Sequence, residues 1–395
     1  MIAKPTSFPT ALCLAGLLLL ARPAARIAQA NPSRAAWRPI CWGLMPSSST
    51  DPFFLPGPFD KFNGPFFRNG QSVADGNGNV TTTVTANYGG TVGAAPHLFS
   101  ASANSLSCKV MKLMTFGYRG QDHAGVLMSG GVAPVLEINS QFDLRLPNTL
   151  LGIIQQDVRE IPTAGIRPIP LEEVEPRLPY PVPPKIWCIG LNYRSHAEDI
   201  NAVQPEDPAS FMKPASCMFQ PGGNIVLPPP DISSDVDAEG ELTIVIGRTC
   251  RFVPREHARE MIYGFTTSLD MTALDVLRLN PRYLTRAKSI DTFFSFGPVI
   301  VTADEVPDVD SLEVITEHND AVCSRDFVRN MKHRPDDLVA FHSQYFTFHP
   351  GDLISTGCPK GARIKAGDNV GCRIDGVGHL IASVIRGERP GSILT

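Results

Sequence analysis

The chain has 395 residues, of which 43% are hydrophobic and 19% charged, and its formal net charge is −4. This composition is that of a globular protein with enough chain for one large or two medium domains, and it gives no electrostatic basis for binding nucleic acid. The nine cysteines are scattered without a CxxC pair, which favours free thiols in a reducing compartment over a disulfide framework.

Residues 1–30 have the pattern of a signal-like segment. The apolar run Ala11–Ala21 lies between Lys4 and Arg22, and the segment ends in the small-x-small sequence Ala28–Ala30. The run is too short for a comfortable membrane span, so we expect a cleaved signal, with a signal anchor as the alternative.

Residues 31–108 are rich in Ser, Thr, Asn, Gly and Pro and show no sustained hydrophobic period. This pattern predicts a disordered segment or a presequence, and a wrongly assigned chain start is a third interpretation. We therefore expect import into an organelle, either mitochondrion or plastid, or entry into the secretory route.

Residues 109–184 are predicted to form a small N-terminal subdomain and a proline-rich linker. Val110–Tyr118 and Ala124–Met128 have the composition of two hairpin strands, and Phe142–Glu160 has a more helical pattern. Ile161–Pro184 contains eight prolines in 24 residues, which is typical of an extended linker.

Residues 185–390 are dominated by short apolar segments and glycine turns, with few helices. The pattern predicts a mixed α/β, β-rich single domain and not a series of βαβ units. Short strands or apolar segments are expected at Lys185–Gly190, Gly297–Thr302, Leu312–His318, Asp352–Ser355 and Val370–Ile374, and helices at Asn192–Asp199, Pro254–Ile262, Thr272–Leu279 and Asp336–Thr347.

One strand carries two acidic side chains on the same face. Leu242, Ile244 and Ile246 alternate with Thr243 and Val245, and the same parity extended backwards places Glu239 and Glu241 together, roughly 7 Å apart at about 3.4 Å per residue. A third carboxylate, Asp270, ends another strand-like run. Three such carboxylates suit a hard cation such as Mg²⁺, and a solvated strand edge is the alternative interpretation.

Seven short motifs between residues 185 and 382 occur in the order found in one protein family. Through them the chain resembles the fumarylacetoacetate hydrolase superfamily, in its short branch of acylpyruvate hydrolases and oxaloacetate tautomerases. The motifs are Cys188–Tyr193 with His196, Phe211–Pro214 with Ser216, Asp237–Leu242, Gly264–Thr266 with Asp270–Ala273, Lys288–Phe293 with Gly297–Pro298, Pro350–Asp352, and Thr356–Gly361.

The resemblance implies a fumarylacetoacetase-type β-roll, a homodimer and one divalent cation, with Mg²⁺ expected and Mn²⁺ or Ca²⁺ as alternatives. The implied metal ligands are Glu239, Glu241 and Asp270. The implied catalytic residues are His196, Lys288 and Asp199, with Glu198 as a substitute for Asp199, and the implied substrate-binding residues are Lys213 and Thr356.

The activity implied by the resemblance is hydrolysis of a C–C bond, decarboxylation or keto–enol tautomerisation of a small β-keto acid through a metal-stabilised enolate. The partner is then a small oxo-acid. The chain also departs from the family, with Leu269, Leu274 and Leu277 where Asn, Arg and Gln are usual. These changes leave a second hypothesis, a catalytically impaired member that binds metal and dimerises without turnover.

Overall fold

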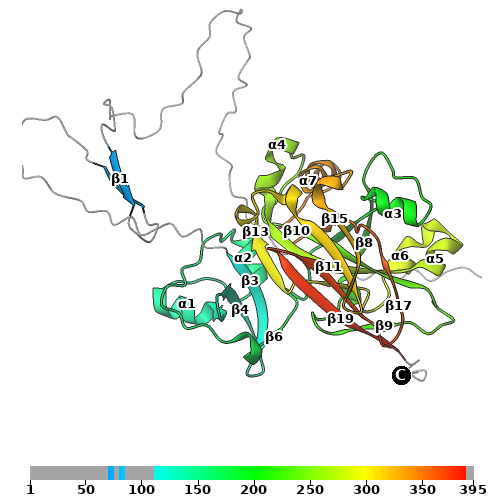
Figure 1. Ribbon diagram of the computed structural model, residues 1–395, viewed down its shortest axis with the longest axis horizontal. Coiled ribbons are helices and arrows are strands. Elements are labelled where there is room, and N and C mark those ends of the chain that lie inside the picture. The colour runs from blue at the N-terminus through cyan, green and yellow to red at the C-terminus, as the bar shows by residue number, and fades with distance from the viewer. Residues whose placement is uncertain (1–69, 75–79, 85–110, 388–395) are drawn as a thin grey trace, which may run out of the picture. The chain divides into compact units, whose positions relative to one another are not determined.

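The computed structural model describes residues 70–74, 80–84 and 111–387 (Figure 1). The chain divides into two compact units, 1–101 and 102–395. In the first unit, β1 (Gly70–Ala74) pairs antiparallel with β2 (Val80–Val84), a hairpin that the sequence pattern did not predict although the second strand is rich in β-branched residues. The signal-like segment lies outside the described residues. Within the described part of the chain, no helix is long and apolar enough to cross a membrane.

The larger sheet of the second unit contains the predicted N-terminal hairpin and most of the main domain. Its main path runs β5-β4-β3-β13-β11-β10-β16-β7-β8, with β12 on β11, β17 on β10 and β6 on β3. The N-terminal strands therefore continue the same sheet as the strands that follow the proline-rich linker. The strands are β3 (Lys112–Tyr118), β4 (Gln121–Met128), β5 (Gly131–Pro134), β6 (Glu175–Pro176), β7 (Ile186–Gly190), β8 (Ala209–Lys213), β10 (Val236–Ile246), β11 (Ile262–Ala273), β12 (Phe294–Phe296), β13 (Val299–Thr302), β16 (Leu353–Ser355) and β17 (Ala362–Ile364).

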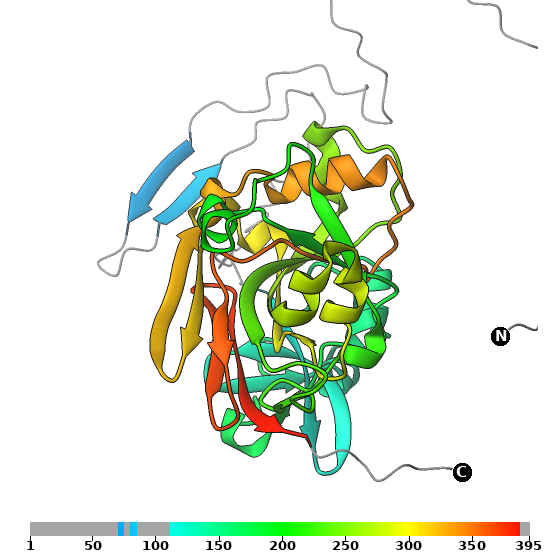
Figure 2. The same ribbon diagram turned by 90° about the vertical axis from the view of Figure 1, so that its right-hand side faces the viewer.

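A second sheet of five strands packs on β10 and β11. Its order is β15-β14-β18-β19-β9, and β14, β18 and β19 contact the two central strands of the larger sheet (Figure 2). A methyl group added at Gly240 would lie 2.8 Å from Thr316 Oγ1, so glycine permits this close approach. The strands are β9 (Asn224–Leu227), β14 (Glu313–His318), β15 (Ala321–Phe327), β18 (Asn369–Ile374) and β19 (Gly378–Arg386).

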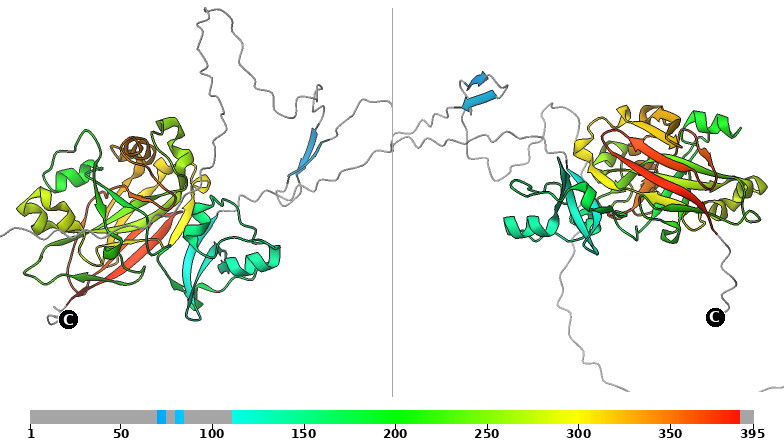
Figure 3. Two further views of the ribbon diagram at one scale, coloured as in Figure 1. Left: turned by 180° about the vertical axis from the view of Figure 1, so that it is seen from behind. Right: turned by 60° about the horizontal axis from the view of Figure 1, so that its bottom comes forward.

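The helices are short and lie around the sheets, with α1 and the N-terminal strands at one end of the larger sheet and α5 and α6 at the other (Figure 3). They are α1 (Val135–Phe142), α2 (Leu150–Gln155), α3 (Arg194–Asp199), α4 (Arg255–Ala258), α5 (Leu274–Leu279), α6 (Leu284–Lys288) and α7 (Pro335–Ser343). Single 3₁₀ turns occur at Leu171–Glu173, Ala215–Cys217, Arg259–Met261, Pro281–Tyr283, Ala303–Glu305, Val309–Ser311 and Val328–Asn330.

The helix expected over Phe142–Glu160 is wrong in its extent. Asp143 takes a left-handed conformation with φ of 50° and ends α1, and α2 starts only at Leu150, where Thr149 accepts a hydrogen bond from the Gly152 N–H. The predicted β-rich mixed fold is otherwise confirmed, and the six cysteines among the described residues are free thiols, as expected.

Both faces of β10 and β11 are buried, and each faces a different environment. Leu242, Ile244 and Phe265 belong to the hydrophobic core beneath the smaller sheet. Val245 and Tyr263 belong to a second core that extends to α2. The acidic residues of β10 lie on the same face as Val245, by the period of two along a strand, and are therefore inside the protein.

Candidate active site

The pairing of β10 with β11 places the predicted carboxylates together. Glu239 lies directly opposite Asp270 in the antiparallel register, and Glu241 lies opposite Ser268. All three acidic side chains are buried, and one oxygen from each lies within 4.8 Å of the others. Cross-strand neighbours share a face of the sheet, so these three side chains form one acidic cluster.

Two lysines partly neutralise this acidic cluster. Lys288, the last residue of α6, donates to Glu239 Oε2 at 2.9 Å and to Asp270 Oδ2 at 3.0 Å. Lys213, the last residue of β8, donates to Asp270 Oδ1 and to the Met271 carbonyl. Three carboxylates and two ammonium groups leave one negative charge in excess when all are ionised.

Glu241 is the carboxylate of this cluster whose ionisation is most disfavoured. Burial raises the pKa of Glu241 to about 8, and the nearby charges of Asp270 and Glu239 act in the same direction. Its hydrogen-bond donors are the neutral Ser355 hydroxyl and the Gly357 N–H, both on Oε2. The lysines bond to the other two carboxylates, so they compensate Glu241 least.

Glu239 responds in the opposite way. Burial also opposes its ionisation, but the charges of Lys288 and His196 and the Thr272 hydrogen bond outweigh burial and lower the pKa of Glu239 to about 2. For Lys288 itself, burial favours the neutral form, but the carboxylates of Asp270 and Glu239 raise the pKa well above its ordinary value. Glu239 and Lys288 are thus a charged pair near neutral pH.

The donor set fits a hard divalent cation. The three ligand groups are all carboxylates, and carboxylate oxygens are ligand atoms that Mg²⁺ and Mn²⁺ prefer. One additional positive charge would also offset the burial and the repulsion that raise the pKa of Glu241.

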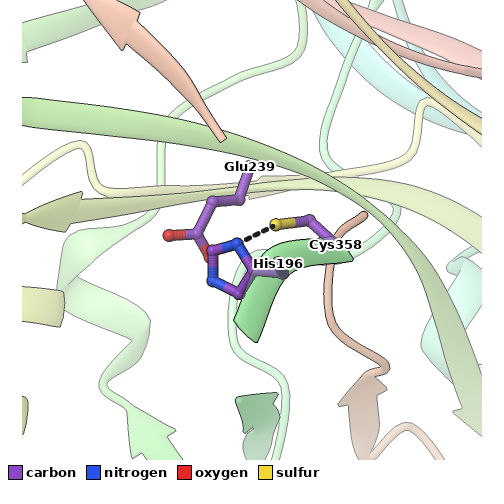
Figure 4. A group of neighbouring side chains, drawn as sticks. All are labelled: His196, Glu239 and Cys358. Atoms are coloured by element: carbon purple, nitrogen blue, oxygen red, sulfur yellow. Dashed lines mark hydrogen bonds between the residues drawn. The ribbon is translucent and has the colours of Figure 1, made fainter. Parts of the chain in front are cut away.

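His196 and Cys358 lie at the rim of the acidic cluster, beside Glu239 (Figure 4). His196, on α3, is half-buried, and its Nδ1 lies 3.8 Å from the Cys358 Sγ. Cys358 follows β16 and is buried. Burial and the nearby Glu239 and Glu241 raise the pKa of the Cys358 thiol well above its ordinary value.

Comparison with known proteins places this chain in a family. The fumarylacetoacetate (FAA) hydrolase C-terminal family matches residues 185–385. The human protein "Oxaloacetate tautomerase FAHD2B, mitochondrial" is 34% identical over 278 residues, which cover 67% of this chain and 87% of that protein. The chain belongs to the fumarylacetoacetate hydrolase family.

Solved structures of this family share the fold. A maleylpyruvate hydrolase from Sphingobium sp. SYK-6, in complex with manganese(II) ion and pyruvate, is 29% identical and gives a TM-score of 0.59 over 70% of this chain and 100% of that one. A 2-hydroxyhepta-2,4-diene-1,7-dioate isomerase from Mycobacterium marinum is 31% identical, with a TM-score of 0.57 over 71% and 100%. The expected fumarylacetoacetase-type fold is confirmed, and the chain belongs to a family of hydrolases and isomerases with small oxo-acid substrates.

Among the described residues, no hydrogen bond or ion pair joins His196 to Asp199 or Glu198, the acids that the family resemblance implies as its partner. Asp199 Oδ1 accepts from Lys360 Nζ at 2.6 Å, and Glu198 is an exposed neighbour of Arg194. The i, i+3 spacing places Asp199 on the same side of α3 as His196, but Asp199 forms its ion pair with the Lys360 ammonium. The contact of His196 is instead with Cys358.

Thr356, expected from the family to hold a substrate carboxylate, donates its hydroxyl to the Leu242 carbonyl at 2.8 Å and is buried. Gly357 follows with φ of 92°, a conformation that favours glycine, and donates its N–H to Glu241. In this structure both residues hold the 356–361 loop against β10.

The three departures from the family pattern lie mainly in the hydrophobic core. Leu269 lies on the opposite face of β11 from Asp270 and is fully buried in the core beneath the smaller sheet. Leu274 is buried on α5, and Leu277 packs against the same core. None of the three leucines takes the place of a carboxylate of the acidic cluster.

Sequence reasoning missed three polar groups near the carboxylates. Thr272 donates to Glu239, Ser355 donates to Glu241, and Cys358 faces His196. Thr272 has the same strand parity as Asp270, and Cys358 lies inside the Thr356–Gly361 motif, so both had a signal in the sequence.

Proposed function

We propose that this chain catalyses hydrolysis or keto–enol tautomerisation of a small β-keto acid, with Mg²⁺ or Mn²⁺ bound by Glu239, Glu241 and Asp270. The observation that carries the proposal is the buried cluster of three carboxylates with the Lys288 ammonium between two of them. When bound, such an ion polarises the carboxylate and oxo oxygens of the substrate as a Lewis acid.

The role proposed for Lys288 is electrostatic. Its ammonium is charged and fixed by two carboxylates, and it stabilises negative charge that develops on a substrate oxygen at the cluster. Lys213 is completely buried and already donates to Asp270 and a backbone carbonyl. It therefore holds Asp270 in place, and its expected contact with the substrate stays a prediction.

The proton-transfer role belongs to His196. It is the half-buried imidazole at the rim of the cluster, and histidine exchanges protons near neutral pH. The same group can take a proton from water in hydrolysis or from carbon in tautomerisation, so the fold does not choose between the reactions. The relatives named oxaloacetate tautomerase and maleylpyruvate hydrolase define the two reactions to compare first, tautomerisation and hydrolysis.

The test uses the purified full chain, freed of metal and then supplied with Mg²⁺. We expect faster enol–keto exchange of oxaloacetate or cleavage of acetylpyruvate, and Glu241→Ala should abolish the metal-dependent rate. Glu256→Ala, at an exposed site on α4, is the matched control and should keep the wild-type rate. Equal rates in wild type and Glu241→Ala would favour the impaired family member that binds metal without turnover.

We further propose that the chain is imported into an organelle and forms a homodimer. The support for import is the signal-like pattern of residues 1–30 and the word "mitochondrial" in the names of relatives. A tagged full-length chain found intact and diffuse in the cytosol would contradict import. Sedimentation analysis that gives the mass of one chain would contradict the dimer.

A further inference from the structure

We propose that His196, Cys358 and Glu239 form a second metal site in this chain, one that takes a thiophilic divalent cation such as Zn²⁺. One ligand atom from each of the three side chains lies within 4.8 Å of the others. The three come from α3, the loop after β16, and β10, and their side chains converge on one point (Figure 4).

The spacing matches a tetrahedral ion. With Zn–S of about 2.3 Å and Zn–N of about 2.0 Å, a tetrahedral angle separates the two ligand atoms by about 3.5 Å. The observed distance between His196 Nδ1 and Cys358 Sγ is 3.8 Å. A shift of a few tenths of an ångström therefore brings this pair to the tetrahedral spacing, Glu239 supplies the third ligand, and a fourth position stays open for water.

Contacts between α3 and the loop after β16 fix the separation of His196 and Cys358. Ser195 Oγ donates to the Pro359 carbonyl at 2.8 Å, and Lys360 Nζ pairs with Asp199 Oδ1 at 2.6 Å. Both contacts join α3 to the loop that carries Cys358. His196 and Cys358 are consequently held facing each other before any ion arrives, which lowers the cost of binding.

The ligand types separate this site from the acidic cluster. A sulfur, an imidazole nitrogen and one carboxylate favour Zn²⁺ and disfavour Mg²⁺, whereas three carboxylates favour the hard ion. His196 is half-buried while Cys358 and Glu239 are buried, so the site can be reached from the histidine side. Glu239 belongs to both sets of ligands.

The consequence for activity rests on the proposed function. A Zn²⁺ ion on these three groups occupies the imidazole of His196 and draws Glu239 away from the acidic cluster. Zn²⁺ is therefore expected to inhibit turnover by competing for side chains within the active site.

The site itself is tested without turnover, by titrating the reduced, metal-free full chain with Co²⁺. A His, Cys and Glu site gives thiolate-to-cobalt charge-transfer absorption and the intense visible bands of a four-coordinate ion, which Zn²⁺ then removes. An all-carboxylate site gives neither. The expected stoichiometry is one such ion per chain.

Three variants assign the signal to its residues. Cys358→Ser and His196→Gln should each lose the four-coordinate spectrum. Cys323→Ser should keep it, because Cys323 is an exposed thiol beside the same loop, with its Sγ 4.0 Å from the Gly361 carbonyl. Absence of the charge-transfer band in wild type, its survival in Cys358→Ser or His196→Gln, or its loss in Cys323→Ser overturns the proposal.

Protection of the thiol provides a measurement that does not depend on how the variants fold. In wild type, Zn²⁺ should slow alkylation of Cys358, mapped by mass spectrometry, while leaving the rate at Cys323 unchanged. Equal protection of both cysteines, or of neither, overturns the site.

A separate experiment measures inhibition of turnover by Zn²⁺ at saturating Mg²⁺. Zn²⁺ should inhibit wild type, and Cys358→Ser should need more than about tenfold higher Zn²⁺ relative to its own uninhibited rate, since even an outer partner of a metal ligand contributes that much to affinity. A cobalt spectrum without turnover would overturn the proposed function and keep the site. Turnover without the spectrum would overturn the site and keep the proposed function.

Discussion

Lys288 places one ammonium group between two buried carboxylates, and its removal leaves Glu239 and Asp270 with less compensating charge. We expect Lys288→Met to lower the free energy of unfolding by about 3–5 kcal/mol in metal-free protein, because breaking a buried ion pair leaves an uncompensated charge. Added Mg²⁺ should restore part of this loss. Urea unfolding with chelator and with Mg²⁺ measures both effects.

The matched control is Lys360→Met, which removes a half-exposed ammonium from its pair with Asp199. Exposed ion pairs contribute little to stability, so this change should be small and independent of Mg²⁺. Equal losses for the two lysine variants would contradict the assigned role of Lys288.

The raised pKa of Glu241 has a consequence for stability. In metal-free folded protein its pKa is about 8, above the ordinary value of 4.5, so the folded state binds more protons between these values. The contribution of Glu241 to the free energy of unfolding therefore falls as the pH rises through this range. Glu239, with its lowered pKa, acts oppositely, and its contribution is lost as the pH falls from 4.5 through about 2.

We expect the Glu241→Gln substitution to remove the alkaline loss of stability. The free energy of unfolding of the variant, relative to that of wild type, should be larger at about pH 9 than at about pH 5, because the Gln side chain cannot ionise. Urea unfolding of both proteins in chelator at the two pH values provides the measurement. A difference that does not change with pH would show that Glu241 titrates normally.

At the scale of single elements, the pattern of β10 predicted more of the site than any other segment. The alternation from Leu242 to Ile246 correctly placed Glu239 and Glu241 on one face. It did not predict that Asp270 stands opposite Glu239, because that register depends on the connection between β10 and β11 and on the irregularity at Val245 and Ile246.

Contacts between loops were beyond the reach of sequence patterns. The helical spacing of His196 and Asp199 was read correctly, but Asp199 binds Lys360 from a loop far along the chain. Such pairings depend on tertiary placement and leave no periodic signal. The loss of helix between Asp143 and Thr149 has a similar cause, since a left-handed residue and a cap override the apolar pattern.

The close contact between the two sheets at Gly240 gives a prediction for β10. A methyl group there would lie 2.8 Å from Thr316 Oγ1 and 3.2 Å from Cys372 Cβ, inside a packed layer. We expect Gly240→Ala to lower the free energy of unfolding by about 1–3 kcal/mol, as overpacking does in cores. Chemical unfolding measures this loss. Gly190→Ala, where an added methyl meets nothing within 4 Å, should cost much less, and equal losses would contradict the packing argument.

For the molecule as a whole, metal binding and folding are expected to be linked. An ion that binds only the folded state at a concentration about 100 times its Kd adds about 2.7 kcal/mol to the free energy of unfolding. We expect this gain with Mg²⁺ in wild type and its loss in Glu241→Gln, measured by urea unfolding with and without chelator. An equal gain in both proteins would place Mg²⁺ elsewhere.

Sequence motifs predicted the fold of the whole molecule because their order, and not any single motif, is distinctive. They could not predict that the N-terminal hairpin joins the same sheet as the main domain, since β3 meets β13 only after a long intervening stretch of chain. The hairpin of β1 and β2 was also missed, because its short polar strands lack an apolar alternation.

The carboxylates stand on paired central strands, whereas His196 stands on α3 and Cys358 on the loop after β16, and these two segments are joined by the Ser195–Pro359 and Asp199–Lys360 contacts. The segments that carry His196 and Cys358 can therefore be varied separately from the strands that carry the carboxylates. Diversifying the segments around 194–199 and 358–361, while keeping His196 and leaving β10, β11, Thr356 and Gly357 untouched, should yield folded enzymes whose preference among oxo-acids has changed. Diversifying β10 and β11 instead, with the other segments kept, should mostly yield insoluble chains.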